Sequence, residues 1–155
     1  MNRRGFYGAA EELLEKSRES GKQVLVIYVD MNNLKIINDR YGHDEGDFSL
    51  KLIGESLEKI VENKGVVGRI GGDEFACIME YDGNDEGESV LKQIYKAFAD
   101  YNQNSDKEYN ITVSAGGSLL KPYDNISLKD ALTQADEKLY EVKKLRTKEV
   151  AKSKK

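Results

Sequence analysis

The chain has 155 residues, of which 39% are hydrophobic and 34% are charged, and its formal net charge is −4. This length corresponds to one domain with a buried core, and the acidic balance argues against a nucleic-acid or membrane-surface partner. The single cysteine, Cys77, cannot form an internal disulfide, which fits a reduced, cytoplasmic setting. The sequence contains no signal peptide and no apolar run of about 18 residues, so we expect no membrane contact by this segment.

Apolar spacing predicts both helices and strands along the chain. In chain order these are a helix at 6–14, a strand at 22–30, helices at 34–41 and 46–61, strands at 65–70 and 75–80, a helix around 90–98, a strand around 111–115 and a last helix from 127 to 142.

The strand at 22–30 contains a continuous apolar run at 24–29, which favours a central position covered on both faces. The strand around 111–115 alternates apolar and polar residues, which predicts one covered face. A long link between the first two strands and a tight hairpin between the next two indicate an α+β fold of the ferredoxin-like kind, with a mostly antiparallel sheet flanked by helices. We expect one domain over 1–147 and a basic tail over 148–155 that frays.

Acidic residues follow the central strand and occupy the hairpin between 65–70 and 75–80. Asp30 ends the first strand, and Asp73 and Glu74 follow Gly71 and Gly72 at the hairpin tip. The two glycines allow a tight turn and the close approach of a bulky ligand. If the strands are neighbours, the three carboxylates converge on one divalent cation bound to a phosphate chain. A solvated acidic turn is the alternative interpretation.

The backbone carbonyl of Met31 can add one more oxygen to such a site. Lys35 follows in the first turn of the next predicted helix, where a cation opposes the helix dipole unless a phosphate is bound nearby. An ordinary surface lysine remains the alternative.

A polar, glycine-broken corner between the helices at 34–41 and 46–61 is a candidate base-binding site. A carboxylate such as Asp47 can accept hydrogen bonds from the N1–H and 2-amino groups of guanine, and Asn38 can pair with a neighbouring edge. Adenine presents an acceptor at N1 and would be rejected. The alternatives are that Asp47 caps the following helix and that Asn38 is a surface residue. His43 alone indicates a structural turn residue.

Several segments in matching order resemble the GGDEF domain of diguanylate cyclases over nearly the whole chain. The resemblance rests on the pentapeptide 71–75, the opening segment 2–6, the strand end 30–35, the corner 38–47, the late strand 112–116 and the last helix at 135–143. It implies the nucleotidyl-cyclase, polymerase palm-type fold and a cytoplasmic, Mg²⁺-dependent enzyme, with Mn²⁺ as an alternative ion, that joins two GTP into cyclic di-GMP and two pyrophosphates.

The resemblance also implies a role for each matching residue. It implies that Asp30, Asp73, Glu74 and the Met31 carbonyl bind metal, and that Asp73 takes the proton of the attacking 3′-hydroxyl. By the same resemblance, Lys35 stabilises phosphate charge in the transition state. The implied substrate-binding residues are Asn38, His43, Asp47, Gly71, Gly72 and Lys143. The implied partners are GTP, a second GGDEF domain in a catalytic homodimer, and an upstream sensory or dimerisation domain.

Two departures from the family pattern qualify this expectation. Arg146 and Thr147 stand where the family has Gly and Arg, which puts one phosphate contact in doubt. Glu62 and Gly65 stand where the family has the Arg and Asp of its product-inhibition motif, so we expect weak or no feedback inhibition through that site. The alternative function is a catalytically weak or inactive GGDEF-type module that binds GTP and regulates a partner.

Overall fold

A four-stranded antiparallel sheet forms the centre of the protein. The computed structural model describes residues 1–153, with side chains described as far as Leu145. The strands are β1 (Val24–Met31), β2 (Gly65–Arg69), β3 (Glu74–Glu80) and β4 (Val113–Leu120). Their order in the sheet is β2-β3-β1-β4, and every neighbouring pair is antiparallel. The predicted α+β architecture and the central position of β1 are both confirmed.

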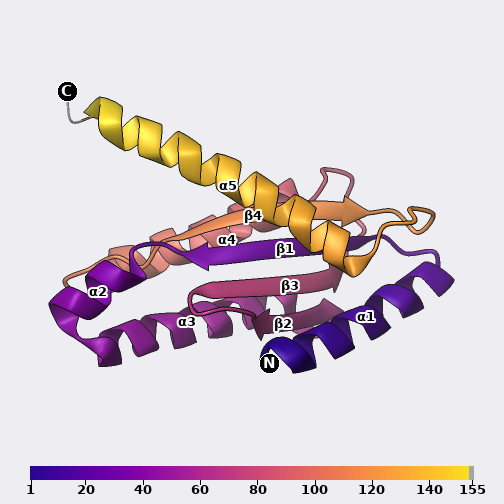
Figure 1. The fold of residues 1–155 in the computed structure, drawn as a ribbon, viewed down its shortest axis with the longest axis horizontal. Helices are drawn as coiled ribbons and strands as arrows, with labels where there is room; N and C mark the ends of the chain where they lie inside the picture. Colours follow the sequence, from indigo (N-terminus) through magenta and orange to yellow (C-terminus); the bar gives the residue numbers. More distant parts are fainter. Residues whose placement is uncertain (154–155) are drawn as a thin grey trace.

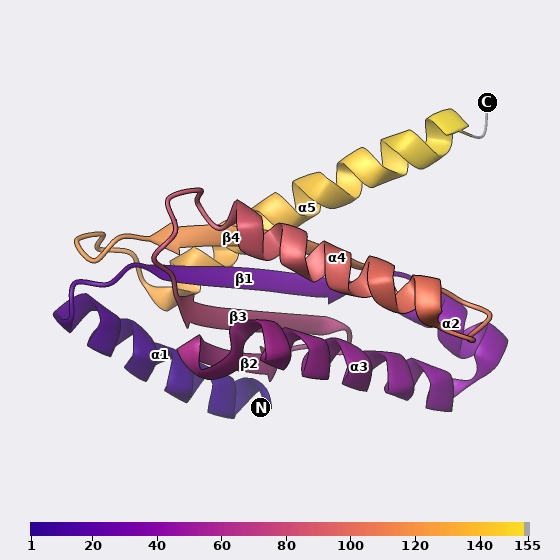
Figure 2. The same cartoon turned by 180° about the vertical axis from the view of Figure 1, so that it is seen from behind.

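Helices cover both faces of the sheet. They are α1 (Arg3–Glu19), α2 (Leu34–Tyr41), α3 (His43–Val61), a 3₁₀ turn η1 (Glu62–Lys64), α4 (Glu88–Asn104) and α5 (Leu128–Ser153). Helices α1 and α5 lie on one face (Figure 1), and α3 and α4 lie on the other (Figure 2). Within the described residues, no helix is both long and apolar enough to span a lipid bilayer.

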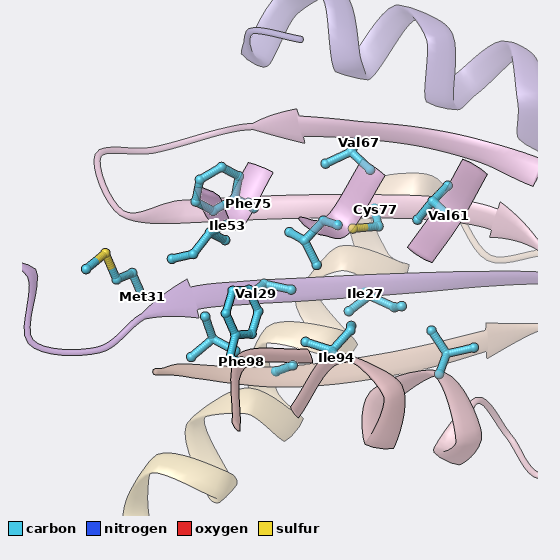
Figure 3. Close-up of a cluster of buried hydrophobic side chains, with 14 of the residues drawn as sticks. Ile27, Val29, Met31, Ile53, Val61, Val67, Phe75, Cys77, Ile94 and Phe98 are labelled. Carbon is cyan, nitrogen blue, oxygen red and sulfur yellow. The ribbon is translucent and has the colours of Figure 1, made fainter. Parts of the chain in front are cut away.

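Strand β1 contributes side chains to both hydrophobic layers because successive residues point to opposite faces. Ile27, Val29 and Met31 face α3 and α4, where they pack with Phe75 and Phe98 (Figure 3). The alternate residues of β1 face α1 and α5, and they include Val24, Val26 and Tyr28. Strand β1 ends at Met31, at the end of the sheet where α2 begins (Figure 1). By this alternation, Asp30 projects toward the α5 side of the sheet.

The prediction of one covered face for the late strand is wrong, because β4 is buried on both faces. Every residue from Val113 to Ser118 is buried. Helix α4 covers one face, while α5 packs so closely on the other that a Cβ placed at Gly116 would lie 2.3 Å from the carbonyl oxygen of Ala135. Ser114 donates a hydrogen bond to Asn32 (3.1 Å), so a small polar residue can occupy this buried strand.

Four helices extend beyond their predicted ranges, among them α4, which spans Glu88–Asn104. Helix α1 begins at Arg3 because the Asn2 side chain accepts a hydrogen bond from the Gly5 amide (2.9 Å). Helix α3 begins at His43, directly after Gly42, whose φ of 98° permits the sharp break from α2. Helix α5 continues through Ser153, past the expected domain boundary at 147.

We expect Asp85 to stabilise the protein in a pH-dependent way. Its carboxylate accepts hydrogen bonds from the amides of Gly87 (3.1 Å) and Ser89 (3.0 Å) at the start of α4. The hydrogen bond from the Tyr81 hydroxyl, followed by those from Ser89 and Gly87, lowers the pKa of Asp85 to about 2. A lowered carboxyl pKa stabilises the folded state above the unfolded pKa, and this contribution is lost as the pH falls.

The measurement is urea unfolding of the wild type and of Asp85→Asn between pH 7 and pH 2. The wild type should be more stable than the variant above about pH 5, and the difference should shrink between about pH 4 and pH 2. A difference that stays constant over this range would show that the carboxylate charge contributes nothing.

Candidate active site

The acidic residues at 30, 73 and 74 lie together at one end of the sheet. Asp30, near the end of β1, stands opposite Glu74, at the start of β3. The Met31 amide donates a hydrogen bond to the Asp73 carbonyl oxygen (2.9 Å). The strands that carry these acids are therefore direct neighbours, as the metal-site hypothesis requires.

The hairpin tip is held by its own backbone and by one arginine. The Ile70 amide donates to the Glu74 carbonyl oxygen (2.9 Å), which closes the turn. The Arg69 guanidinium donates to the carbonyl oxygens of Gly71 (3.3 Å) and Gly72 (2.6 Å). A Cβ at Gly72 would meet no atom within 4 Å, so the backbone there is open to a bulky ligand.

The pKa of Asp30 is raised by its surroundings. Burial raises its pKa most, and the neighbouring negative charge of Asp73 raises it further, while the Lys143 ammonium acts in the opposite direction. Lys143 reaches from α5 and forms an ion pair with Asp30 Oδ2. The other oxygen, Oδ1, is buried and has no hydrogen-bond partner. An unpaired buried carboxylate oxygen is costly unless a cation or a donor binds it.

The second carboxylate, Glu74, accepts a hydrogen bond from the Tyr28 hydroxyl. Burial, followed by this hydrogen bond, raises the pKa of Tyr28 and keeps its hydroxyl protonated. Asp30, Glu74, Tyr28 and Lys143 all line a cleft of about 580 Å³ under α5. This cleft is large enough to admit a phosphate chain beside the carboxylates.

The carboxylates of Asp30, Asp73 and Glu74 are suitable ligands for a divalent cation, but their side chains do not converge on one position. In the described part of the chain, no group of three or more His, Cys, Asp or Glu side chains is arranged to hold a metal ion. Two of the three carboxylates already have partners in this arrangement, Asp30 with Lys143 and Glu74 with Tyr28. The orphaned oxygen of Asp30 and the adjacent charge of Asp73 are features that a hard cation would satisfy.

Two substitutions should move the pKa of Asp30 in opposite directions. Lys143→Met removes the nearby ammonium and should raise this pKa, whereas Asp73→Asn removes the repelling carboxylate and should lower it. Nuclear magnetic resonance titration of the Asp30 carboxyl carbon measures both shifts. Shifts of the same sign in the two variants would contradict the described geometry.

The candidate base-binding corner lies between α2 and α3. Asn38 Oδ1 is buried without a hydrogen-bond partner, and it fills the space beside Gly46, where a Cβ would come within 1.8 Å of it. Asp47 is exposed and lines a groove of about 320 Å³ together with Arg69 and Phe75. The capping alternative for Asp47 is wrong, because α3 begins four residues earlier, at His43.

Not every predicted site residue enters these two clefts. Lys35 is exposed in the first turn of α2, and His43 is exposed at the start of α3; neither lines the cleft under α5 or the groove beside Asp47. The Asp47 groove also contains none of the three acids at 30, 73 and 74. The side chains of Arg146 and Thr147 lie outside the described residues, so the expectation about the altered phosphate contact is not tested.

Tyr28 is the site residue that sequence reasoning missed. It lies two residues before Asp30 on β1 and therefore on the same face of the sheet. The Tyr28 hydroxyl is a polar group on an otherwise apolar strand, on the same face as Asp30. This pattern could have identified Tyr28 from the sequence. Its partner Glu74 could not have been identified from spacing within one strand.

The antiparallel sheet with helices on both faces is the nucleotidyl-cyclase palm fold, because it matches known structures of that class. The structure of the active GGEEF domain of a diguanylate cyclase from Vibrio cholerae superposes with a TM-score of 0.81 at 26% identity, covering 92% of this chain and 90% of that one. The profile described as "Diguanylate cyclase, GGDEF domain" matches residues 1–149, and the chain therefore belongs to the GGDEF domain family.

Curated relatives differ in what their names describe. Diguanylate cyclase DgcP of Escherichia coli K12 is 31% identical over 144 residues, which cover 92% of this chain and 42% of DgcP. Cyclic di-GMP phosphodiesterase NbdA of Pseudomonas aeruginosa is 29% identical over 143 residues, covering 92% of this chain and 18% of NbdA. The chain thus spans less than half the length of either relative.

Proposed function

We propose that this domain is a diguanylate cyclase that condenses two GTP molecules into cyclic di-GMP with release of two pyrophosphates. The observation that carries the proposal is the pairing of Asp30 with Glu74 across β1 and β3, with Asp73 beside them on the hairpin. Membership of the GGDEF family supports the same reaction. Each domain holds one GTP, so two domains must face each other for the reaction.

In the proposed reaction, the 3′-hydroxyl of each GTP attacks the α-phosphorus of the other. A new O3′–P bond forms, the bond from the α-phosphorus to the bridging oxygen breaks, and pyrophosphate leaves. Asp73 takes the hydroxyl proton. Asp30, Asp73, Glu74 and the Met31 carbonyl would hold Mg²⁺ or Mn²⁺, which supplies charge neutralisation on the phosphates when bound.

Two lysines have distinct proposed roles. Lys143 already reaches the acidic end of the sheet, and in the nucleotide complex it would turn from Asp30 to the phosphates. Lys35 would approach the transferred phosphate from the start of α2. Such a transfer depends mainly on alignment and electrostatic stabilisation. Loss of either lysine ammonium should therefore reduce turnover more than folding stability.

Guanine recognition is proposed for Asn38 and Asp47, with His43 nearby. The buried, unpaired Oδ1 of Asn38 supports this role, because such an atom is costly without a partner. The exposed carboxylate of Asp47 in its groove supports recognition of the N1–H and 2-amino groups.

The second candidate function is a GTP-binding regulatory module that makes little or no product. The contacts of Lys143 with Asp30 and of Tyr28 with Glu74 favour it, because both carboxylates already have partners. Incubating the protein with GTP and Mg²⁺ at increasing protein concentration separates the two. We expect cyclic di-GMP, with a rate per domain that rises with concentration, whereas GTP binding without product would support the regulatory module.

Feedback inhibition through the family's usual motif should be weak. Gly65 stands at the Asp position of that motif, and a Cβ there would lie 1.9 Å from the Ile78 carbonyl oxygen. The backbone at this position therefore excludes any carboxylate side chain. Measuring turnover with added cyclic di-GMP tests this, and strong non-competitive inhibition would contradict it.

A further inference from the structure

The loop between α4 and β4, residues 105–112, contacts the corner between α2 and α3. The Lys107 ammonium lies 2.7 Å from Glu45 Oε1 in an ion pair, and the Tyr109 hydroxyl donates to the same oxygen (2.9 Å). The Tyr109 ring also packs on Tyr41, with 5.0 Å between ring centroids. Lys107 further lies 4.6 Å from the centre of the Phe48 ring.

Glu45 is well placed to transmit these contacts. It lies in the first turn of α3, two residues from His43 and two from Asp47. Its backbone carbonyl accepts a hydrogen bond from the Ser49 hydroxyl (2.8 Å). Contacts with the Glu45 carboxylate therefore restrain the start of α3, which carries Asp47.

The far end of the same loop is fixed to α4 and to the segment that follows β1. The Asn102 side chain makes two hydrogen bonds with the backbone of Ile111, both of 2.8 Å. The Asn32 amide donates to the Thr112 carbonyl oxygen (2.9 Å), two residues after Asp30. The loop thus connects the end of β1, where the acids lie, to the start of α3, where the base-binding corner lies.

We propose that Lys107 and Tyr109 are positioning residues that hold the guanine-reading corner against the acidic end of the sheet by clamping Glu45. This inference rests on the proposed function, since it assigns these residues to the GTP site. They do not touch the nucleotide; they act through the helix that presents Asp47. Their loss should weaken GTP binding and leave the chemical step unchanged.

The experiment measures KM and kcat for GTP in Lys107→Met, Tyr109→Phe and the double variant. It also measures the affinity for 3′-deoxy-GTP with Mg²⁺, a probe that keeps guanine and triphosphate but has no attacking hydroxyl. We expect KM and the dissociation constant to rise about threefold in each single variant, because the ion pair is partly exposed and screened. The double variant should show a rise of about tenfold. In all three, kcat should stay within about twofold.

Two further variants separate positioning from general stability. Lys107→Arg keeps the ion pair, so its KM should equal that of the wild type. Lys96→Met removes another exposed ion pair, between Lys96 and Asp100 (2.9 Å) on the outer face of α4, and should leave KM unchanged.

Three outcomes would overturn the inference. In the first, wild-type affinity for 3′-deoxy-GTP in the double variant would show that the clamp does not act on the corner. In the second, an equal rise in KM in Lys107→Met and Lys96→Met would show that the ion pair only stabilises the fold. A fall in melting temperature large enough to explain the weaker GTP binding would show the same. In the third, failure of the wild type to bind 3′-deoxy-GTP would overturn the proposed function, and this inference with it.

Discussion

Replacing Asp73 by asparagine should reduce cyclic di-GMP formation by about a thousandfold. The amide cannot take the proton of the attacking hydroxyl and is a poorer ligand for a hard cation. The fold should persist, because Asp73 contributes repulsion rather than attraction to its neighbour Asp30. We therefore expect an unchanged or slightly raised melting temperature beside the lost activity, measured by product chromatography and calorimetry.

The matched control is Asp82→Asn. Asp82 is an exposed acid at the other end of the sheet, beyond Glu80, which pairs with Val24 at the start of β1. Its substitution should change neither activity nor stability by a measurable amount. Residual activity of Asp73→Asn above about a tenth of the wild-type rate would remove Asp73 from its assigned role.

Adding one methyl group at Gly116 should be among the most destabilising single changes in the protein. An alanine Cβ would lie 2.3 Å from the Ala135 carbonyl oxygen and 2.5 Å from the Leu139 amide nitrogen, both backbone atoms of α5. Since neither can move without shifting the helix, we expect a loss of about 3 kcal/mol. For a domain of this size, that corresponds to a fall in melting temperature of about 10 °C.

Gly116→Ala should also reduce turnover, because α5 carries Lys143 into the site. The control is Gly8→Ala, at an exposed position within α1 where a Cβ would meet nothing within 4 Å. That change should stabilise the protein by about 0.5–1 kcal/mol, as helix propensity predicts. Equal melting temperatures for the two variants would contradict the close packing of α5 on β4.

The sequence was most informative where one pattern had one physical interpretation. The continuous apolar run of β1 favoured a strand covered on both faces, and the hairpin tip at 71–74 was marked by its glycines. The alternation around 111–115 was misleading, since Thr112, just before β4, and Ser114 look solvent-facing in sequence. Ser114 is buried through its hydrogen bond to Asn32, and a long-range partner of this kind cannot be read from local spacing.

The candidate site shows the same limit. The convergence of Asp30 with the hairpin followed from the expectation that the two strands are neighbours. The partners of the carboxylates did not follow, because Lys143 is 113 residues from Asp30 and Tyr28 is 46 residues from Glu74. The contact of Lys107 with Glu45 spans 62 residues and carries no local pattern.

The most direct test is a crystal structure of the protein with Mg²⁺ and 3′-deoxy-GTP. The account predicts a cation between the carboxylates of Asp30 and Asp73, with the Lys143 ammonium moved from Asp30 to the phosphates and guanine against Asp47. A nucleotide bound elsewhere, with the ion pair between Lys143 and Asp30 intact and no cation at the hairpin, would contradict it.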